Sequence, residues 1–173
     1  MKIKKAVIIT GPGFEDPEVI YPYFRLQESK IKTDIATSSD SEIKGKHGYP
    51  IKPTVLINDL SVKKYDAVII PGGHEAPDRV RQVKKILQFV RKMNKTGKIV
   101  SSTCHGPWVL ISAGILKGKN ATCYIGMKDD LINAGAIYHQ EAVVVDGNII
   151  TSDHPHNLAS WMKTTVSLIS KIS

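Results

Sequence analysis

The sequence predicts an α/β protein whose mostly parallel central sheet is covered by helices on both faces. Short apolar runs rich in β-branched residues recur along the 173-residue chain, and segments with apolar side chains at helical spacing separate them. Strands buried on both faces form such continuous apolar runs, whereas strands with one solvated face alternate in polarity. Because no repeat or linker interrupts this alternation, we expect a single domain over residues 1–173.

The N-terminal part is expected to contain a strand, a helix and a second strand. The run "KKAVIIT" (4–10) predicts a buried strand, which the turn-rich "GPGFEDP" follows. Pro17 suits the first turn of a helix, where its missing N–H leaves no hydrogen bond unmade, and apolar side chains recur at helical spacing after it. "IKTDIATS" (31–38) predicts the next strand, and the glycines and prolines between residues 45 and 53 indicate a loop or hairpin.

The remaining chain continues the alternation. "YDAVIIPGG" (65–73) predicts a strand closed by two glycines, and apolar spacing from Val80 to Met93 predicts one helix up to Gly97. "KIVSSTC" (98–104) predicts another buried strand, followed by a helix over 106–113. Asp146-Gly147 between two apolar runs is typical of a β-hairpin, and residues 158–172 predict a C-terminal helix.

The composition indicates a soluble protein with a basic surface. The net charge is +8, but the lysines are scattered and aromatic residues make up only 6%, so we expect a solvated basic face and no nucleic-acid partner. No stretch approaches the roughly 20 apolar residues of a membrane span. The N-terminus lacks the features of a signal peptide, and the two cysteines form no CxxC pair. We therefore expect a cytoplasmic protein with no membrane partner.

Chemically distinctive residues follow three of the expected strands. Glu15 follows the first strand, Gly72-Gly73 closes "YDAVIIPGG", and Cys104-His105 follows "KIVSST". In a parallel sheet covered on both faces, ligands bind beyond the carboxyl ends of the strands. We expect these three loops to converge on one crevice.

A cysteine at this position has the setting of a nucleophile. At a helix start, unpaired N–H groups and the positive end of the helix dipole lower a thiol pKa. A strand-to-helix turn lifts the side chain clear of the sheet, and the N–H groups of His105 and Gly73 would form an oxyanion hole. The adjacent His105 imidazole would act as general base or, as imidazolium, stabilise the thiolate.

Each of these residues also has a structural interpretation. Cys104 could be a small core residue, and Cys123, which has no adjacent base, is expected to be structural. Glu15 or Asp16 could cap the helix that begins near Pro17, and the glycine pair could simply form a turn.

Segments spread over nearly the whole chain carry a resemblance to a known family. They are "GFEDPEVIYPYFRL", "GKHGYPIK", "YDAVIIPGGHEAPDRVR", "STCHGPWVLISAGILKGKNATCY", "MKDDLINAGA", "VVVDGNIITS" and "LASWM". The combination of "FED", "PGG" and "CHG" is specific. On these motifs the chain resembles the PfpI family of intracellular cysteine proteases, in the DJ-one/PfpI superfamily of the class I glutamine amidotransferase-like fold.

The resemblance implies a flavodoxin-like three-layer sandwich with a strained elbow at the nucleophile Cys104. It makes His105 the partner of the thiol and Glu15 a buried acid that touches it. In the family's proteases the third member of the triad is a glutamate from a neighbouring subunit. The matching residue here is Asp78, which is one methylene shorter, and Glu75 is an alternative. The resemblance thus implies a homo-oligomer, a dimer or a larger assembly such as a hexamer.

The segment "TSDHPHN" departs from the family pattern. Relatives commonly carry an arginine where this chain has Asp153, which would change the preference for anionic substrate groups. His154 or His156 could restore positive charge and are candidate substrate-binding residues. Two histidines that flank a proline, with no third ligand nearby, are weak support for a metal site, and we expect no metal and no other cofactor. Asp153 could also cap the last helix.

These features predict a cysteine-dependent hydrolase. Its activity would be that of a peptidase, or of a deglycase or glyoxalase acting on methylglyoxal adducts, with a peptide, glycated-protein or glyoxal substrate. The alternative is a non-enzymatic, redox-sensing stress chaperone in which Cys104 is oxidised.

Overall fold

A seven-stranded sheet forms the centre of the protein. The computed structural model describes residues 3–172, and the strand order is β10-β11-β7-β6-β1-β2-β5. All neighbours pair in parallel except β10 and β11. The strands are β1 (Lys5–Ile9), β2 (Lys32–Thr37), β5 (Val55–Leu56), β6 (Ala67–Ile70), β7 (Ile99–Thr103), β10 (Val143–Asp146) and β11 (Ile149–Ser152).

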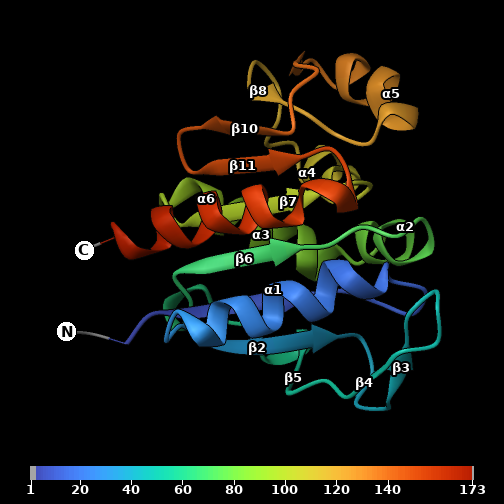
Figure 1. Cartoon of the computed structure of the whole chain (residues 1–173), viewed down its shortest axis with the longest axis vertical. Coiled ribbons are helices and arrows are strands. Elements are labelled where there is room, and N and C mark those ends of the chain that lie inside the picture. The colour runs from blue at the N-terminus through green and yellow to red at the C-terminus, as the bar shows by residue number, and fades with distance from the viewer. Residues whose placement is uncertain (1–2, 173) are drawn as a thin grey trace.

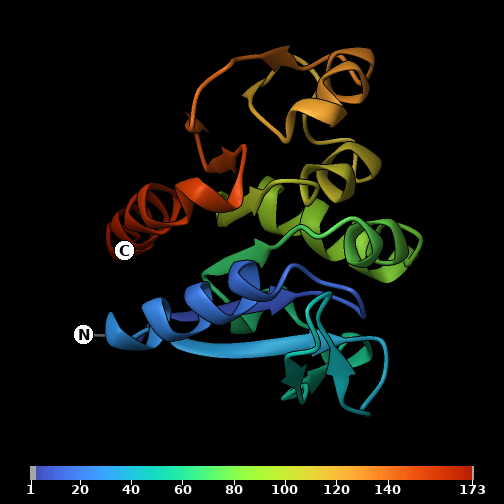
Figure 2. The same ribbon diagram turned by 45° about the vertical axis from the view of Figure 1, so that its right-hand side comes forward.

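Helices cover both faces of this sheet, which confirms the predicted three-layer α/β class (Figure 1). Helices α1 and α6 cross one face, and α3 and α4 lie on the other, as the turned view also shows (Figure 2). The helices are α1 (Asp16–Glu28), α2 (Glu75–Arg81), α3 (Lys84–Lys95), α4 (Pro107–Ser112), α5 (Lys128–Asn133) and α6 (Leu158–Ser170). None of the helices in residues 3–172 is long and apolar enough to cross a membrane.

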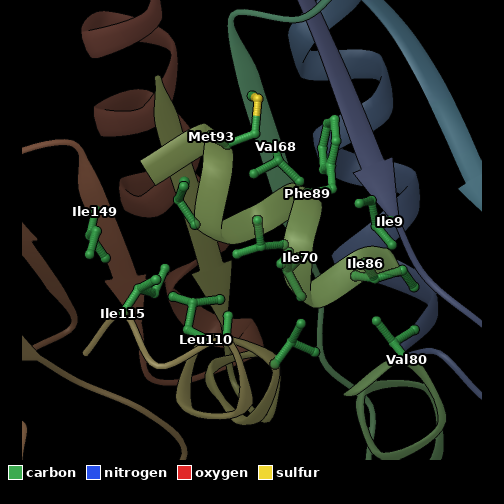
Figure 3. Close-up of a cluster of buried hydrophobic side chains, with 14 of the residues drawn as sticks. Ile9, Val68, Ile70, Val80, Ile86, Phe89, Met93, Leu110, Ile115 and Ile149 are labelled. Carbon is green, nitrogen blue, oxygen red and sulfur yellow. The ribbon is translucent and has the colours of Figure 1, made fainter. Parts of the chain in front are cut away.

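The two faces of the sheet bury separate apolar clusters. Strands β6 and β7 are buried at every position, as expected for strands covered on both sides. Figure 3 shows the cluster beneath α3, where Phe89 and Met93 pack against Val68 and Ile70 of β6. On the opposite face, Trp161 of α6 is part of the second cluster.

Two short strand pairs lie outside the main sheet. The excursion expected between residues 45 and 53 contains an antiparallel pair, β3 (Ile43–Lys44) with β4 (Pro50–Ile51). A second pair, β8 (Asn120–Ala121) with β9 (Ile137–Tyr138), is parallel. Strands β5, β8 and β9 and helix α5 are not indicated by the sequence pattern, because two-residue strands and a six-residue helix carry little periodicity.

The prediction of a single helix from Val80 to Gly97 is wrong, because the helical conformation is interrupted between α2 and α3. Val83 is extended, with φ −89° and ψ 101°. The apolar spacing continues across the break because Val83 packs against the cluster that contains Val80 and Ile86. Periodicity alone therefore could not reveal the break.

The parallel strands all end at the same edge of the sheet. In Figure 1 this edge is on the right, where the loops to α2 and the β3–β4 pair also lie, and both termini are on the left. The hairpin expected at Asp146-Gly147 is confirmed: β10 pairs with β11 from Asp146 opposite Ile149. It brings the end of β11 beside the end of β7.

Candidate active site

Cys104 lies in a strained turn between β7 and α4. Its φ of 56° is in the left-handed region, which costs free energy for a residue with a side chain. Backbone bonds hold the turn: Cys104 N donates to Ser152 O, and Tyr124 N donates to Cys104 O, each at 3.0 Å. A side chain at Gly106 would collide with the carbonyl oxygen of Ile70, so the turn can form only with glycine there. The elbow expected from "STCHGP" is present.

The "PGG" loop supplies the second wall of the crevice. An added Cβ at Gly72 would lie 2.6 Å from Glu18 Oε2 and 2.8 Å from Cys104 Cβ, so only glycine allows this approach. The N–H groups of His105 and Gly73 both hydrogen-bond to the thiol of Cys104. These are the two N–H groups expected from the sequence to form an oxyanion hole, and in the structure both lie beside the sulfur.

Glu18, and not Glu15, is the acid beside the thiol. Glu18 is fully buried, its Oε2 accepts a hydrogen bond from Gly72 N, and its carboxyl interacts with Cys104. Glu15 Oε1 instead lies 3.3 Å from His47 Nε2, and its Oε2 lies 3.4 Å from Lys46 Nζ, at the mouth of the crevice. The prediction that Glu15 touches the thiol is therefore wrong.

The position of the helix start explains the difference between the two glutamates. Glu15 is the N-cap residue of α1 and makes no capping hydrogen bond with its side chain. Glu18 is in the first turn, where a side chain leans back toward the N-terminus of the helix and so toward the strand ends. The signal was available in "FEDPE", since Pro17 indicates where the helix begins.

Burial sets the protonation of the Cys104–Glu18 pair. It raises the pKa of Glu18 from 4.5 to about 7. Burial also raises the pKa of the Cys104 thiol, the Glu18 carboxylate raises it further, and the N–H groups of His105 and Gly73 act in the opposite direction. The expected lowering of the thiol pKa is therefore wrong for the single chain, because desolvation outweighs the donors of the helix start.

His105 is a neutral imidazole in this environment. Its Nδ1 lies 3.3 Å from Cys104 Sγ. Burial lowers the pKa of His105 to about 4, and the charges of His74 and Lys46 contribute in the same direction. Of the two roles open from the sequence, the imidazolium form is thus disfavoured in the single chain.

An aromatic wall that the sequence analysis missed surrounds His105. Tyr124 stacks on the imidazole at 4.7 Å between ring centroids, and Trp108 and His74 contact it at 5.0 and 5.5 Å. The candidate His154 reaches this wall through Tyr124, at 6.1 Å between centroids. The ring centroid of His156 lies 4.3 Å from that of His154.

Asp78 is not part of the crevice of its own chain. It is exposed on α2, where its carboxylate accepts a hydrogen bond from Gln82. The alternative, Glu75, pairs with Arg79 on the same helix. Within residues 3–172 of one chain, neither carboxylate contacts His105. The role of Asp78 across an interface stays a prediction.

Cys123 differs from Cys104 in its surroundings. It is a free thiol with no exposed surface, and burial raises its pKa to about 12, with Asp130 and Asp153 acting in the same direction. No base is paired with it in the described chain, as expected for a structural cysteine.

The site contains a buried cysteine in a strained strand-to-helix turn, with a histidine and a buried carboxyl next to the thiol. This combination defines the class of this protein. The chain belongs to the DJ-1/PfpI family, which it matches over residues 4–168.

Comparison with known proteins identifies enzymes among its relatives. It is 45% identical to Deglycase PfpI of Pyrococcus furiosus over 165 residues, which cover 95% of this chain and 99% of that protein. It is 36% identical to the putative cysteine protease YraA of Bacillus subtilis, over 96% of this chain and 98% of that protein.

The solved structures show the same fold. A two-domain protein of Anabaena variabilis, with DJ-1/ThiJ/PfpI-like and ferritin-like domains, superimposes with a TM-score of 0.94 and 37% identity. The match covers 96% of this chain and 48% of that one, so the chain spans about half the length of this relative.

Proposed function

We propose that this protein is a cysteine-dependent hydrolase or deglycase whose nucleophile is the thiolate of Cys104. The observation that carries the proposal is the Cys104 elbow, with Glu18 beneath the sulfur and two N–H donors beside it. The names of the relatives, a deglycase and a putative cysteine protease, support both reactions.

Glu18 is the residue best suited to take the proton of the thiol. A general base works best with a pKa near the operating pH, and burial raises the pKa of Glu18 to about 7. His105, with a pKa lowered to about 4, is the weaker base in the single chain. We therefore assign the proton acceptor to Glu18 rather than to His105, the candidate general base in the sequence.

The reaction would then proceed as a nucleophilic displacement at carbon. The Cys104 sulfur attacks the substrate carbon as its proton passes to Glu18. At a peptide carbonyl, the N–H groups of Gly73 and His105 stabilise the resulting oxyanion, which collapses as the C–N bond to the amine breaks. At a hemithioacetal carbon, the sulfur displaces the thiol directly, and the hemithioacetal left on Cys104 then releases the aldehyde and regenerates the free thiol. In both cases Glu18 returns the proton to the leaving amine or thiol. For a peptide, water subsequently hydrolyses the thioester on Cys104, which regenerates the thiol.

Turnover of three substrate classes tests this proposal. A peptide, a methylglyoxal-modified protein and free methylglyoxal are assayed with the wild type, Cys104→Ser and the matched control Cys123→Ser. We expect Cys104→Ser to abolish turnover of whichever substrate is used and Cys123→Ser to retain it. Glu18→Gln should lower kcat by about a hundredfold or more, the usual effect of losing a general base.

The alternative, a redox-sensing chaperone, gives a different result in the same experiment. In that case the wild type turns over none of the three substrates, while peroxide oxidises Cys104 and changes the protein's ability to suppress aggregation of a client protein. Equal turnover by the wild type and Cys104→Ser would contradict the proposed nucleophile.

A further inference from the structure

The imidazole of His105 is oriented mainly by contacts with other rings. Its only hydrogen-bond partner within residues 3–172 is Cys104 Sγ, which lies 3.3 Å from Nδ1. Sulfur is a weak donor and a weak acceptor, so this bond alone fixes the direction of the imidazole poorly. The position of the imidazole beside the thiol therefore depends on the aromatic wall of Tyr124, Trp108 and His74.

Trp108 is the ring of this wall that is itself anchored. Its Nε1–H donates a hydrogen bond to Asp130 Oδ2 at 2.8 Å. The Tyr124 hydroxyl and the His74 imidazole make no hydrogen bond within residues 3–172. The bond to Asp130 is charge-assisted, and such bonds are shorter and stronger than bonds between neutral groups. It fixes the edge of the indole while the ring contacts His105 at 5.0 Å between centroids.

Two neighbouring helices hold the indole from different directions. Helices α2 and α5 both pack against α4, which carries Trp108 in its first turn. From α2, the guanidinium of Arg81 lies 5.6 Å from the indole centroid, close enough for cation–π attraction. Arg81 Nε also donates to Ser112 Oγ at 2.9 Å, one turn further along α4. Arg81 thus steadies the face of the indole, and Asp130 of α5 holds its N–H.

Asp130 also has a purely structural interpretation. It lies in the first turn of α5, where a negative charge interacts favourably with the helix dipole. Asp129 lies in the same turn and is exposed like Asp130, but its side chain makes no hydrogen bond or ion pair within residues 3–172. The dipole applies equally to both aspartates. Only the bond to the Trp108 indole distinguishes Asp130, so Asp129 provides the matched control.

We propose that Asp130 is a positioning residue that acts through the indole of Trp108 to hold the His105 imidazole beside the thiol of Cys104. The hydrogen bond keeps the indole against the imidazole, and the indole in turn limits rotation of the imidazole away from the sulfur. The inference rests on the proposed function, because it takes Cys104 as the reacting residue.

Steady-state kinetics on the substrate that the wild type turns over test this role. We expect Asp130→Ala to lower kcat about tenfold with KM unchanged, because a displaced imidazole affects the chemical step and leaves substrate binding intact. Asp130→Asn should rescue kcat to within about twofold of the wild type, since the amide oxygen accepts the same hydrogen bond. The control Asp129→Ala should retain the kcat of the wild type.

A double-mutant cycle tests whether Asp130 acts through Trp108. Trp108→Phe keeps an aromatic ring but removes the N–H that Asp130 accepts. If the two residues share one interaction, the double variant Asp130→Ala/Trp108→Phe should have the same kcat as Trp108→Phe alone. Losses of kcat that multiply in the double variant would overturn the proposal, because the two residues would then act independently. Trp108→Phe also supports the test if Asp130→Ala does not fold.

An NMR titration of the His105 ring gives a measurement that does not depend on turnover. Burial lowers the pKa of His105 to about 4, the charges of His74 and Lys46 act in the same direction, and that of Glu15 opposes them. If Asp130→Ala loosens the indole, water reaches the imidazole and its pKa should rise by about one unit. Loss of a carboxylate charge alone would lower this pKa, so the direction of the shift separates the two effects. The His105 signals are assigned by comparison with His105→Asn.

The two measurements separate this inference from the proposed function. A raised pKa of His105 in Asp130→Ala, with no substrate turned over by the wild type, would retain the positioning role and reject the hydrolase. Turnover by the wild type, with Asp130→Ala equal to Asp129→Ala in both kcat and the pKa of His105, would reject only the positioning role. An equal loss of kcat in these two variants would overturn it as well, because the stability of α5 would then explain the effect.

Discussion

Cys104 and Glu18 act as one unit because their acidic groups interact within the same buried volume. Such a pair releases its protons in steps that belong to both groups. With Glu18 ionised, its charge opposes formation of the thiolate, whereas a protonated Glu18 can donate a hydrogen bond to it. The reactivity of the Cys104 thiol therefore depends on which of the two residues holds the shared proton.

Alkylation of Cys104 should report this coupling. Above pH 7 we expect Glu18→Gln to react with iodoacetamide about tenfold faster than the wild type, because the carboxylate no longer raises the pKa of the thiol. The rate is measured from pH 5 to 10 by mass spectrometry, with Cys123 as an internal reference that labels later. Glu15→Gln is the control and should leave the profile unchanged. A slower reaction of Glu18→Gln would show instead that protonated Glu18 stabilises a resting thiolate.

The same carboxyl should make stability depend on pH. The folded protein holds the Glu18 proton up to about pH 7, whereas the unfolded chain loses it near 4.5. Between these values the native state binds more protons, so the free energy of unfolding falls as pH rises, by about 3 kcal/mol from this group.

Urea unfolding of the wild type and Glu18→Gln at a series of pH values checks this. The stability of the wild type relative to the variant should decline between pH 4.5 and 7, and the subtraction removes other titrating groups such as His105. A constant difference across that range would contradict the raised pKa.

The β3–β4 hairpin is held over the crevice by the first residue of α1. The buried carboxylate of Asp16 accepts hydrogen bonds from the backbone N–H groups of His47 and Tyr49, both at 2.9 Å. Gly45 packs so closely on this carboxylate that a side chain would collide with it. Asp16 thus joins two elements, where the sequence analysis considered it only as a helix cap.

Asp16→Ala should loosen the hairpin while leaving the sheet folded. We expect the amide protons of His47 and Tyr49 to exchange with solvent at least about tenfold faster, because each loses a charge-assisted hydrogen bond. Hydrogen exchange followed by NMR measures this, and Asp40→Ala, an exposed position ahead of the hairpin, is the control. Unchanged exchange at both amides would show that other contacts hold the hairpin.

At the scale of the whole molecule, no carboxylate among residues 3–172 of one chain hydrogen-bonds to the imidazole of His105. Burial lowers the pKa of the His105 imidazole, the charges of His74 and Lys46 act in the same direction, and the charge of Glu15 offsets only part of the shift. A carboxylate from a second copy would raise that pKa and hold the ring by a charge-assisted hydrogen bond. Asp78 is available for this, since it is exposed on α2, which lies at the edge of the sheet where the parallel strands end (Figure 1).

Complementation between two inactive variants tests this arrangement. Asp78→Ala should lower turnover without lowering the melting temperature, and mixing it with Cys104→Ala should recover activity, because some interfaces then combine an intact Cys104 with an intact Asp78. Mixing Asp78→Ala with the double variant Cys104→Ala/Asp78→Ala is the control and should recover none. A monomer in analytical ultracentrifugation, or full activity of Asp78→Ala, would show that each site is complete in one chain.

Local patterns were sufficient to predict the frame of this protein. Continuous apolar runs identified β1, β6 and β7, because a strand covered on both faces has no polar side. The sequence "STCHGP" indicated the elbow, since an apolar strand ends there and a proline begins a helix. The N–H donors of Gly73 and His105 were also predictable, because a backbone donor needs only the path of the chain.

Contacts between distant side chains were decided only by the tertiary structure. Glu18 meets the glycine loop 54 positions away, and it lies only three positions after the wrong candidate, Glu15. The direction of the thiol pKa depends on burial, which arises from all the layers together and outweighs the local helix start. The sequence by itself thus determined where a nucleophile would stand, because a local pattern specifies where the backbone turns. Packing decided which acid reaches that position, because only the folded layers specify what surrounds a side chain.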